Sequence, residues 1–188
     1  DTLRGGYVSC YYPEAPIKTS NLDGLAARGA RFDRVWSPIP LTTPAHASIF
    51  SGLYPPGHGV RNNARFRLPD DVQTLAEMLH AQGASTGAVV SSFVTSRQFG
   101  LAQGFDDFFD DLGNDPSGAA RSQRPGNETM DLALDWLRRH SAKPFFLWVH
   151  LYDPHTPYRP PPEYMQTARG NAYAGEVAFA DAQLGRLL

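Results

Sequence analysis

Residues 36–63 read WSPIPLTTPAHASIFSGLYPPGHGVRNN and contain the clearest helix start in the sequence. Pro44 is favourable as a first helical residue, because the N–H that it lacks would have had no partner there. We therefore expect Thr43 to cap this helix, Thr42 to lie just before it, and Gly52 to end it. Free N–H groups at the helix start would attract an anion beside Thr42. Alternatively, both threonines only cap a buried helix.

The composition is that of one globular domain, with 188 residues, 41% of them hydrophobic, and a formal net charge of −2. The basic residues are scattered, which argues against a nucleic-acid-binding surface. Cys10 is the one cysteine, so the sequence excludes an internal disulfide and a cysteine-based zinc site. No apolar run approaches the roughly 20 residues that a membrane-spanning helix needs, and no signal peptide opens the sequence.

Strand and helix signals alternate on both sides of the central stretch. Such alternation predicts an α/β fold with a mostly parallel central sheet and helices on both faces. The apolar run PFFLWVHL, at 144–151, is expected in the middle of that sheet. We expect helices at 20–28, 69–82, 127–140 and 173–188. The first has a capping box at Ser20–Asp23, and the second is opened by Pro69-Asp70-Asp71. We expect strands at 30–36, 84–92 and 144–151, and loops at 104–126 and 160–170.

The loop at 104–126 carries two acidic pairs, Asp106-Asp107 and Asp110-Asp111. Four carboxylates in a short segment could bind calcium. The segment lacks the regular alternation and the terminal Glu of an EF-hand loop, however, so a solvated loop is the favoured interpretation.

Asp153 and His155 directly follow the 144–151 strand. We expect Asp1 at the same edge of the sheet, because ligands bind at the carboxyl ends of the strands in open α/β folds. Taken alone, a histidine between prolines is usually a turn residue, and a leading aspartate is usually a solvated terminus.

Several motifs together point to a family. DTLR at 1–4, the threonines at 42–43, GLYPPGHGVRNN at 52–63 and DPHTPY at 153–158 resemble the signature of the sulfatase branch of the alkaline phosphatase superfamily, in its order and spacing. The resemblance implies a hydrolase of sulfate or phosphate esters of small molecules or glycans, in an extracytoplasmic or periplasmic location. It also implies that residues 1–188 form the N-terminal part of one catalytic domain, truncated at both ends.

The resemblance implies roles for individual residues. Thr42 stands at the nucleophile position, and Asp1 and Thr42 bind a divalent metal, with Asp153 as a further possible ligand. His46 lies where sulfatases place an arginine, so it would orient Thr42 or contact the metal. Two more residues complete the predicted catalytic group: Asn63, which stabilises the charged oxygens with the helix N-terminus, and His155, which holds the substrate anion.

The sequence departs from the family pattern at three places. Gly5-Gly6-Tyr7 occupies the position of a second aspartate, and Val90-Ser91-Ser92-Phe93 occupies that of a Gly-Lys-x-His motif. Thr42 stands where relatives have a Cys or Ser that is oxidised to formylglycine. Oxidising a threonine would yield a ketone, so formylglycine is not expected. A metal-activated hydroxyl, as in the nucleotide pyrophosphatase and phosphodiesterase relatives, remains possible.

Alternatives follow from these departures. The metal would be Ca²⁺ in a sulfatase, and Zn²⁺ or Mn²⁺ in a phosphodiesterase. The function could also be that of a phosphodiesterase or phosphonate-type hydrolase, or of a degenerate protein that binds anionic esters or glycans without cleaving them. A nucleotide-binding module is disfavoured, because no phosphate-binding glycine motif follows a strand. His58 and Arg61 stay open between a catalytic role and a role in chain geometry.

Overall fold

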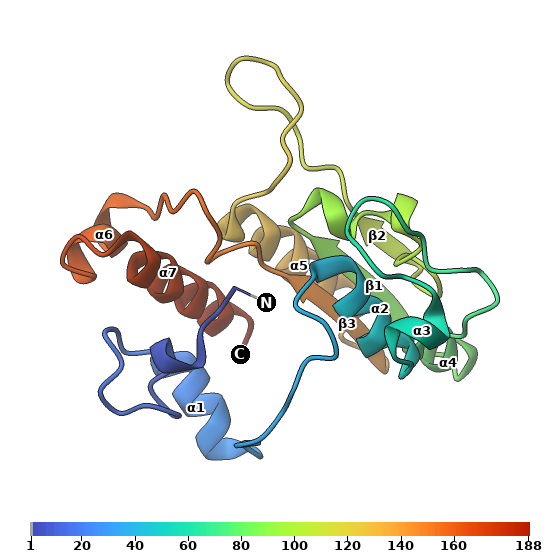
Figure 1. Ribbon diagram of the computed structural model, residues 1–188, viewed down its shortest axis with the longest axis horizontal. Coiled ribbons are helices and arrows are strands. Elements are labelled where there is room, and N and C mark those ends of the chain that lie inside the picture. Colours follow the sequence, from blue (N-terminus) through green and yellow to red (C-terminus); the bar gives the residue numbers. More distant parts are fainter. Residues whose placement is uncertain (1) are drawn as a thin grey trace. The chain divides into compact units, whose positions relative to one another are not determined.

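A computed structural model describes residues 2–188, so the predictions for Asp1 lie outside the described residues. Figure 1 shows an α/β arrangement in which a parallel sheet is accompanied by helices. The elements are η1 (Gly5–Tyr7), α1 (Ser20–Arg28), α2 (Thr42–Ser51), α3 (Pro55–His58), α4 (Leu75–Ala81), β1 (Ser85–Val90), η2 (Phe93–Thr95), η3 (Arg97–Phe99), β2 (Asp107–Phe109), α5 (Gly126–His140), β3 (Phe145–His150), α6 (Pro162–Thr167) and α7 (Ala172–Leu187).

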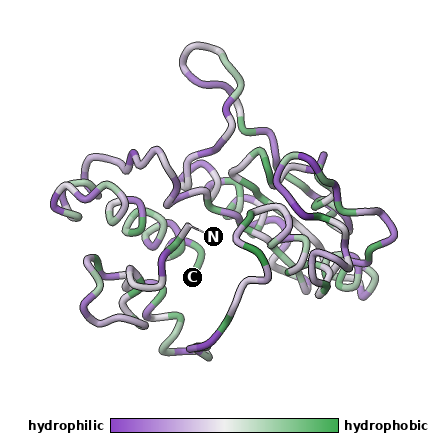
Figure 2. Tube along the Cα trace, in the orientation of Figure 1, coloured by the Kyte–Doolittle hydropathy of each residue, from purple (hydrophilic) through white to green (hydrophobic). Residues whose placement is uncertain are grey.

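The chain forms two compact units. Unit 1 comprises residues 2–35, 125–130 and 151–188, and unit 2 comprises residues 36–124 and 131–150. The hydrophobic core of unit 1 joins Ile17 to Tyr173 and Val177 of α7. The core of unit 2 joins α2, through Ala47 and Phe50, to residues that include Val60, Leu68 and Leu101. In Figure 2, hydrophobic residues are found along α7 and in the region of the sheet.

The sheet of unit 2 has the strand order β2-β1-β3, with both pairs parallel. Ala88 of β1 pairs with Phe108 of β2 and with Trp148 of β3. Within residues 2–188, β1 is therefore the central strand, and the prediction that placed 144–151 in the middle is wrong. A continuous apolar run indicates burial but does not determine how many neighbours a strand has.

Helices cover both faces of this sheet, as the sequence predicts. Successive side chains of a strand point to opposite faces. Trp148 packs against Phe50 of α2, with ring centroids 4.7 Å apart. Phe145, an odd number of positions away, instead contacts Trp136 of α5 at 5.9 Å. The α2 and α5 helices therefore lie on opposite faces.

The caps of two helices differ from the prediction because distant or later residues supply them. The N–H groups of Asn21 and Leu22 in α1 donate to the Asp181 carboxylate of α7, and no capping box forms at Ser20. Helix α4 begins at Leu75 rather than near 69, because Thr74 and its partner Glu77 form the capping box there. At both places the sequence pattern predicted one capping residue, and the observed hydrogen bonds come from a different one.

Three predicted segments also differ from the structure. Residues 30–36 contain no strand, and Val35 and Trp36 are exposed there. The predicted loop at 160–170 contains α6, and the predicted loop at 104–126 contains β2. The segment between β2 and α5 projects from the rest of unit 2 (Figure 1). Within residues 2–188, no helix combines the length and hydropathy that crossing a membrane would require.

Candidate functional site

Helix α2 begins at Thr42, two residues earlier than predicted, and extended Leu41 is the N-cap. Leu41 has no side-chain oxygen, so the cap comes from elsewhere: the Thr43 N–H donates to Asn63 Oδ1 at 2.8 Å. Pro44 has no N–H, and the Ala45 N–H donates to Leu41 O at 3.0 Å. The expectation of free N–H groups at this end is therefore wrong for residues 43–45.

The two adjacent threonines have different environments. Thr43 is fully buried, and its hydroxyl donates to the Val94 carbonyl at 2.6 Å. This hydrogen bond holds α2 against the segment after β1. Thr42 is partly exposed at the first helical position. The two threonines therefore differ in burial, and the role of Thr42 as a nucleophile stays a prediction.

His46 lies one helical turn after Thr42. Its Nδ1–H donates to the Thr42 carbonyl at 2.8 Å, so the imidazole stabilises the backbone of the first turn and retains a lone pair on Nε2. Its ring packs on Trp148 at 5.2 Å and on His150 at 5.1 Å. Burial lowers the pKa of His46, which favours the neutral imidazole.

His150, at the end of β3, is a residue that sequence reasoning did not select. Its Nδ1 lies 3.5 Å from Ser91 Oγ, and the Ser91 hydroxyl donates to the His150 carbonyl. Burial, followed by the proximity of His46, lowers the pKa of His150 to about 3. The period-two spacing of Trp148 and His150 could have indicated this pair, since both face α2.

His58 has a structural role. It is 1% exposed; its Nδ1 accepts from the Val60 N–H at 3.1 Å, and its Nε2–H therefore donates to Ser48 Oγ at 2.9 Å. A histidine that donates to a serine cannot at the same time take that serine's proton. The Pro-Gly-His-Gly turn thus fastens α3 to α2. Arg61 is exposed, and its role stays open.

Asp153 and His155 lie in unit 1, on the segment after β3. Asp153 Oδ2 accepts from the Gly126 N–H at the start of α5, at 3.0 Å, and burial raises the pKa of Asp153. His155 Nδ1 donates to the Thr156 carbonyl at 2.7 Å, and the ring stacks on Tyr152 at 4.2 Å. Thr42 belongs to the other unit, so the convergence of Thr42 with His155 stays a prediction.

Glu176 of α7 holds the His155 segment and was also missed by sequence reasoning. Its carboxylate accepts from the His155 N–H at 3.0 Å and from the Arg159 N–H at 2.6 Å. Glu176 is 3% exposed, and burial raises its pKa. An acidic residue in the first turns of a helix usually indicates a dipole interaction, so no sequence signal distinguished this one.

The acidic loop is explained by protein partners. Asp106 accepts from the Thr86 N–H at 2.9 Å, Asp107 from Trp136 Nε1 at 2.8 Å, and Asp110 pairs with Arg97 at 2.9 Å. Within residues 2–188, no group of three or more His, Cys, Asp or Glu side chains could hold a metal ion. The described residues therefore do not supply a complete ligand set on their own.

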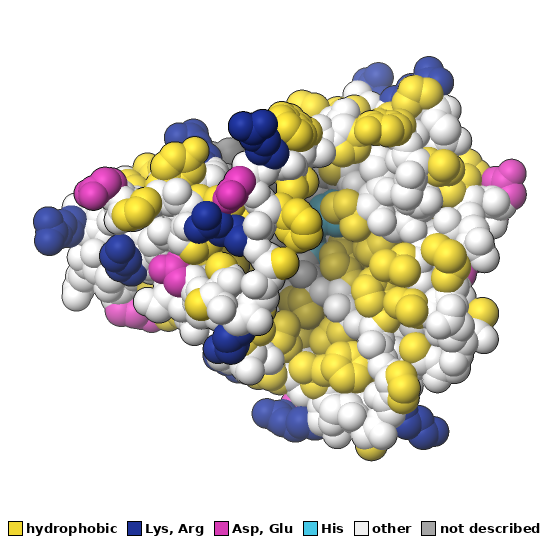
Figure 3. All heavy atoms as spheres, turned by 90° about the horizontal axis from the view of Figure 1, so that it is seen from below, with side chains coloured by type: hydrophobic (Ala, Val, Ile, Leu, Met, Phe, Trp, Pro, Cys, Tyr) yellow, Lys and Arg dark blue, Asp and Glu magenta, His cyan; other side chains and the backbone are white. Residues whose placement is uncertain are grey.

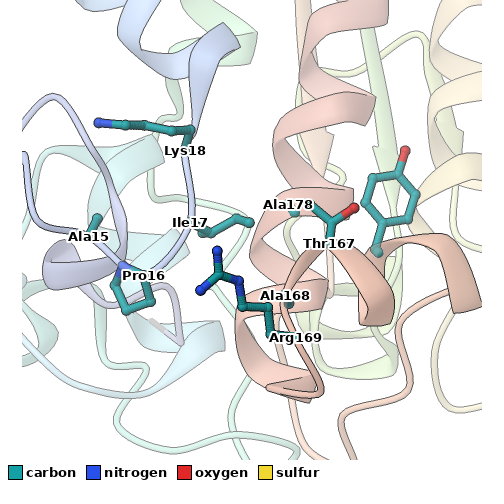
Figure 4. Close-up of a pocket in the computed structure, with 9 residues that line it drawn as sticks. Ala15, Pro16, Ile17, Lys18, Thr167, Ala168, Arg169 and Ala178 are labelled. Atoms are coloured by element: carbon teal, nitrogen blue, oxygen red, sulfur yellow. The ribbon is translucent and has the colours of Figure 1, made fainter.

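A surface pocket in unit 1 is lined by residues of 15–18, of α6 and the turn that follows it, and of α7 (Figure 4). Ile17 and Arg169 extend into it, whereas the Lys18 ammonium points away and donates to the Pro13 carbonyl at 3.3 Å. None of the predicted site residues lines this pocket. Large hydrophobic side chains such as Ile49 and Tyr54 are exposed elsewhere, and Figure 3 shows hydrophobic groups interspersed with polar ones on one face.

Solved structures share this fold. The structure titled Ps i-CgsB in complex with k-i-k-neocarrahexaose matches with a TM-score of 0.82 at 22% identity, covering 100% of this chain and 52% of that one. The phosphonate monoester hydrolase of Agrobacterium radiobacter matches with a TM-score of 0.74 at 19% identity, covering 100% of this chain and 56% of that one. The predicted alkaline phosphatase-like α/β fold is confirmed.

Sequence comparison identifies the family. N-acetylglucosamine-6-O-sulfatase from Bacteroides thetaiotaomicron is 27% identical over 193 residues, which cover 95% of this chain and 34% of that protein. The chain thus spans about a third of the length of this curated relative. A family model described as Sulfatase matches residues 1–188. The match extends over all the motifs on which the resemblance rested, and the chain therefore belongs to the sulfatase family.

Proposed function

We propose that the full-length protein hydrolyses sulfate esters of small molecules or glycans, with Thr42 as the nucleophile. The observation that carries this proposal is the difference between the two threonines. Thr43 uses its hydroxyl to bind the Val94 carbonyl, whereas Thr42 occupies the first, partly exposed position of α2. Membership of the sulfatase family, and the name of the relative from Bacteroides thetaiotaomicron, support the reaction type.

The proposed reaction has two displacements. Thr42 Oγ1 forms a bond to sulfur while the bond from sulfur to the ester oxygen breaks, and the hydroxyl proton ends on the departing alcohol. Water then attacks the sulfur of the Thr42 sulfate ester, which releases sulfate and restores the hydroxyl. Splitting hydrolysis in this way replaces one difficult step with two easier ones.

Asn63 would stabilise the charge on the nonbridging oxygens. Its Oδ1 accepts from the Thr43 N–H, which fixes the orientation of the amide and presents the Nδ2 hydrogens on the opposite side. His46 would orient Thr42 through the Thr42 carbonyl. His155 would hold the substrate anion, as the family resemblance implies. Pre-oriented donors of this kind stabilise transition-state charge without reorganising during the reaction.

A divalent cation is part of the proposal. Asp1 and Thr42 are its expected ligands, and Asp153 is a weaker candidate, because Asp153 Oδ2 already accepts from the Gly126 N–H. Calcium is expected for a sulfatase, and zinc or manganese for a phosphodiesterase. Such a cation would lower the pKa of the attacking hydroxyl. We also propose an extracytoplasmic or periplasmic location.

Hydrolysis of phosphate diesters or phosphonates is the second candidate. A threonine at the nucleophile position favours it, because a hydroxyl attacks phosphorus directly and formylglycine is not expected here. The two candidates share the same first step and differ in the central atom of the substrate. Parallel assays with an aryl sulfate and an aryl phosphate diester would separate them.

Thr42→Ala in the full-length protein tests the nucleophile. We expect loss of ester hydrolysis with an unchanged circular dichroism spectrum, whereas Thr42→Ser should retain part of the activity. Thr43→Val is the matched control, because it removes the neighbouring hydroxyl and should reduce stability but not the rate of hydrolysis. Hydrolysis by Thr42→Ala at the wild-type rate would reject the assignment. Substrate binding without turnover by the wild-type protein would indicate the degenerate form.

A further inference from the structure

The loop at 155–159 depends on one side chain of α7. Glu176 Oε2 accepts from the His155 N–H, and Glu176 Oε1 accepts from the Arg159 N–H. The two donors lie at the two ends of the loop, so a single carboxylate joins them. Thr156, Pro157 and Tyr158, between the donors, are exposed. Within this exposed part, the Tyr158 ring packs edge-to-face on Tyr173 of α7 at 5.2 Å, and the backbone at the two ends of the loop is held by Glu176.

The Glu176 carboxylate lies deep enough for these bonds to matter. The residue is 3% exposed, and hydrogen bonds to a buried charged group are shorter and stronger than those between neutral groups. Helix α7 packs closely against the end of the loop at the residue before Glu176, because a Cβ on Gly175 would lie 2.8 Å from Pro160 Cγ. Glycine at 175 thus permits the approach that lets Glu176 reach both N–H groups.

From this geometry we infer that Glu176 is a positioning residue for His155, which it holds in the orientation needed to bind the anionic group of the ester. The inference rests on the proposed function, because it assumes that His155 contacts the substrate. Glu176 itself makes no contact with substrate in this scheme. It acts through the backbone of His155, because its carboxylate accepts a hydrogen bond from the His155 N–H. The His155 ring itself is oriented by the Thr156 carbonyl and by Tyr152.

Helix α7 also supplies a matched control. Asp181 is 6% exposed, and its carboxylate accepts from the backbone N–H groups of Asn21 and Leu22 at 3.1 and 2.9 Å. Asp181 therefore makes the same kind of contact as Glu176, from the same helix, but to α1 instead of to the His155 loop. Asp181→Asn and Glu176→Gln both replace one acceptor oxygen by a donor and should destabilise the protein to a similar degree.

The experiment compares four variants of the full-length protein: Glu176→Gln, Asp181→Asn, His155→Ala and the double variant Glu176→Gln/His155→Ala. Hydrolysis of an aryl sulfate gives kcat and KM, and urea unfolding gives stability. We expect Glu176→Gln to raise KM about tenfold with kcat little changed, because ground-state and transition-state binding weaken together. Asp181→Asn should leave KM within about twofold of wild type. In the His155→Ala background, Glu176→Gln should have no further effect on KM.

Two results would overturn the inference: a KM for Glu176→Gln equal to that of Asp181→Asn, or an undiminished effect of Glu176→Gln when His155 is absent. A wild-type KM for His155→Ala would instead reject the role of His155 in the proposed function. If Glu176→Gln does not fold, Glu176→Asp retains the charge but is one methylene shorter, so it cannot reach both N–H groups. If the protein lacks turnover, titration with inorganic sulfate, followed by the NMR signal of His155, provides the same comparison.

Discussion

Asn63 caps α2 and has a proposed catalytic role, and single substitutions can separate the two. Asn63→Ala removes the acceptor of the Thr43 N–H and should reduce the free energy of unfolding by about 1 kcal/mol. Asn63→Asp retains an acceptor oxygen, so its stability should stay within about 0.5 kcal/mol of wild type. Both variants lose the proposed amide donor, and kcat should fall roughly 100-fold in each. Urea unfolding and steady-state kinetics of the full-length protein measure the two effects.

Asn62→Ala is the control for this comparison. Asn62 is exposed, and its Oδ1 accepts from the Asn63 N–H next to it. We expect its stability to change by no more than about 0.5 kcal/mol and its kcat to stay at the wild-type value. A normal kcat for Asn63→Asp would show that Asn63 only caps α2.

The low pKa of His150 leads to a prediction of how the free energy of unfolding depends on pH. Its pKa is about 3 in the folded protein and about 6.5 in the unfolded chain. Between these values the unfolded chain binds more protons, so stability is fully present above about pH 6.5 and is lost as the pH falls. The loss at pH 5, relative to pH 8, should be about 2 kcal/mol from this residue. Burial lowers the pKa of His46 as well, which acts in the same direction.

His150→Asn tests this prediction, because an asparagine amide can donate to Ser91 but does not titrate. Urea unfolding between pH 5 and 8 should give a shallower pH dependence for the variant than for wild type. The slopes are compared, rather than the absolute stabilities, since the substitution also changes packing. Equal slopes would contradict the prediction, because they would mean that the pKa of His150 is the same in the folded protein and in the unfolded chain.

At the scale of elements, the contact between β1 and α5 depends on a glycine. A Cβ on Gly87 would lie 2.4 Å from Cε2 of Trp136, a residue that is fully buried. Gly87→Ala should therefore destabilise the protein by about 1–3 kcal/mol through overpacking. Adding Trp136→Phe should make the double variant more stable than the sum of the two single effects predicts. Thermal or urea unfolding measures all three variants.

Gly6→Ala is the control at this scale, because a Cβ at Gly6 would meet nothing within 4 Å. Its effect should stay within about 0.5 kcal/mol. An equally small loss for Gly87→Ala would show that the strand and the helix separate easily. In that case, the close packing of β1 on α5 would contribute little to the stability of unit 2.

At the scale of the whole molecule, metal dependence can be tested only with the full-length protein. The chain spans about a third of its curated relative, and Asp1 lies outside the described residues. We expect a chelator to abolish hydrolysis, because the proposed hydroxyl nucleophile needs its pKa lowered. Restoring activity by Ca²⁺ with an aryl sulfate, or by Zn²⁺ or Mn²⁺ with a phosphate diester, would identify the metal and substrate together. Full activity after exhaustive chelation would contradict the proposal.

The sequence predicts the sheet strands 84–92 and 144–151 and the helices 127–140 and 173–188 close to their observed bounds, because each has a strong periodic or apolar pattern. It fails at 30–36 and at 160–170, where short segments have little pattern of their own. It also places β3 in the middle of the sheet, since burial by covering helices and burial by neighbouring strands leave the same apolar signal.

The sequence by itself determined the family, the α/β class and the candidate residues Thr42, Asn63 and His155, because motifs and periodicity are local. The tertiary structure alone decided which side chains support those residues. Asn63, 20 positions away, caps Thr43, and Glu176, 21 positions away, holds His155. Asp181 caps α1 across 160 positions. A hydrogen bond between distant residues depends on where the backbone brings them, and no local pattern records that position.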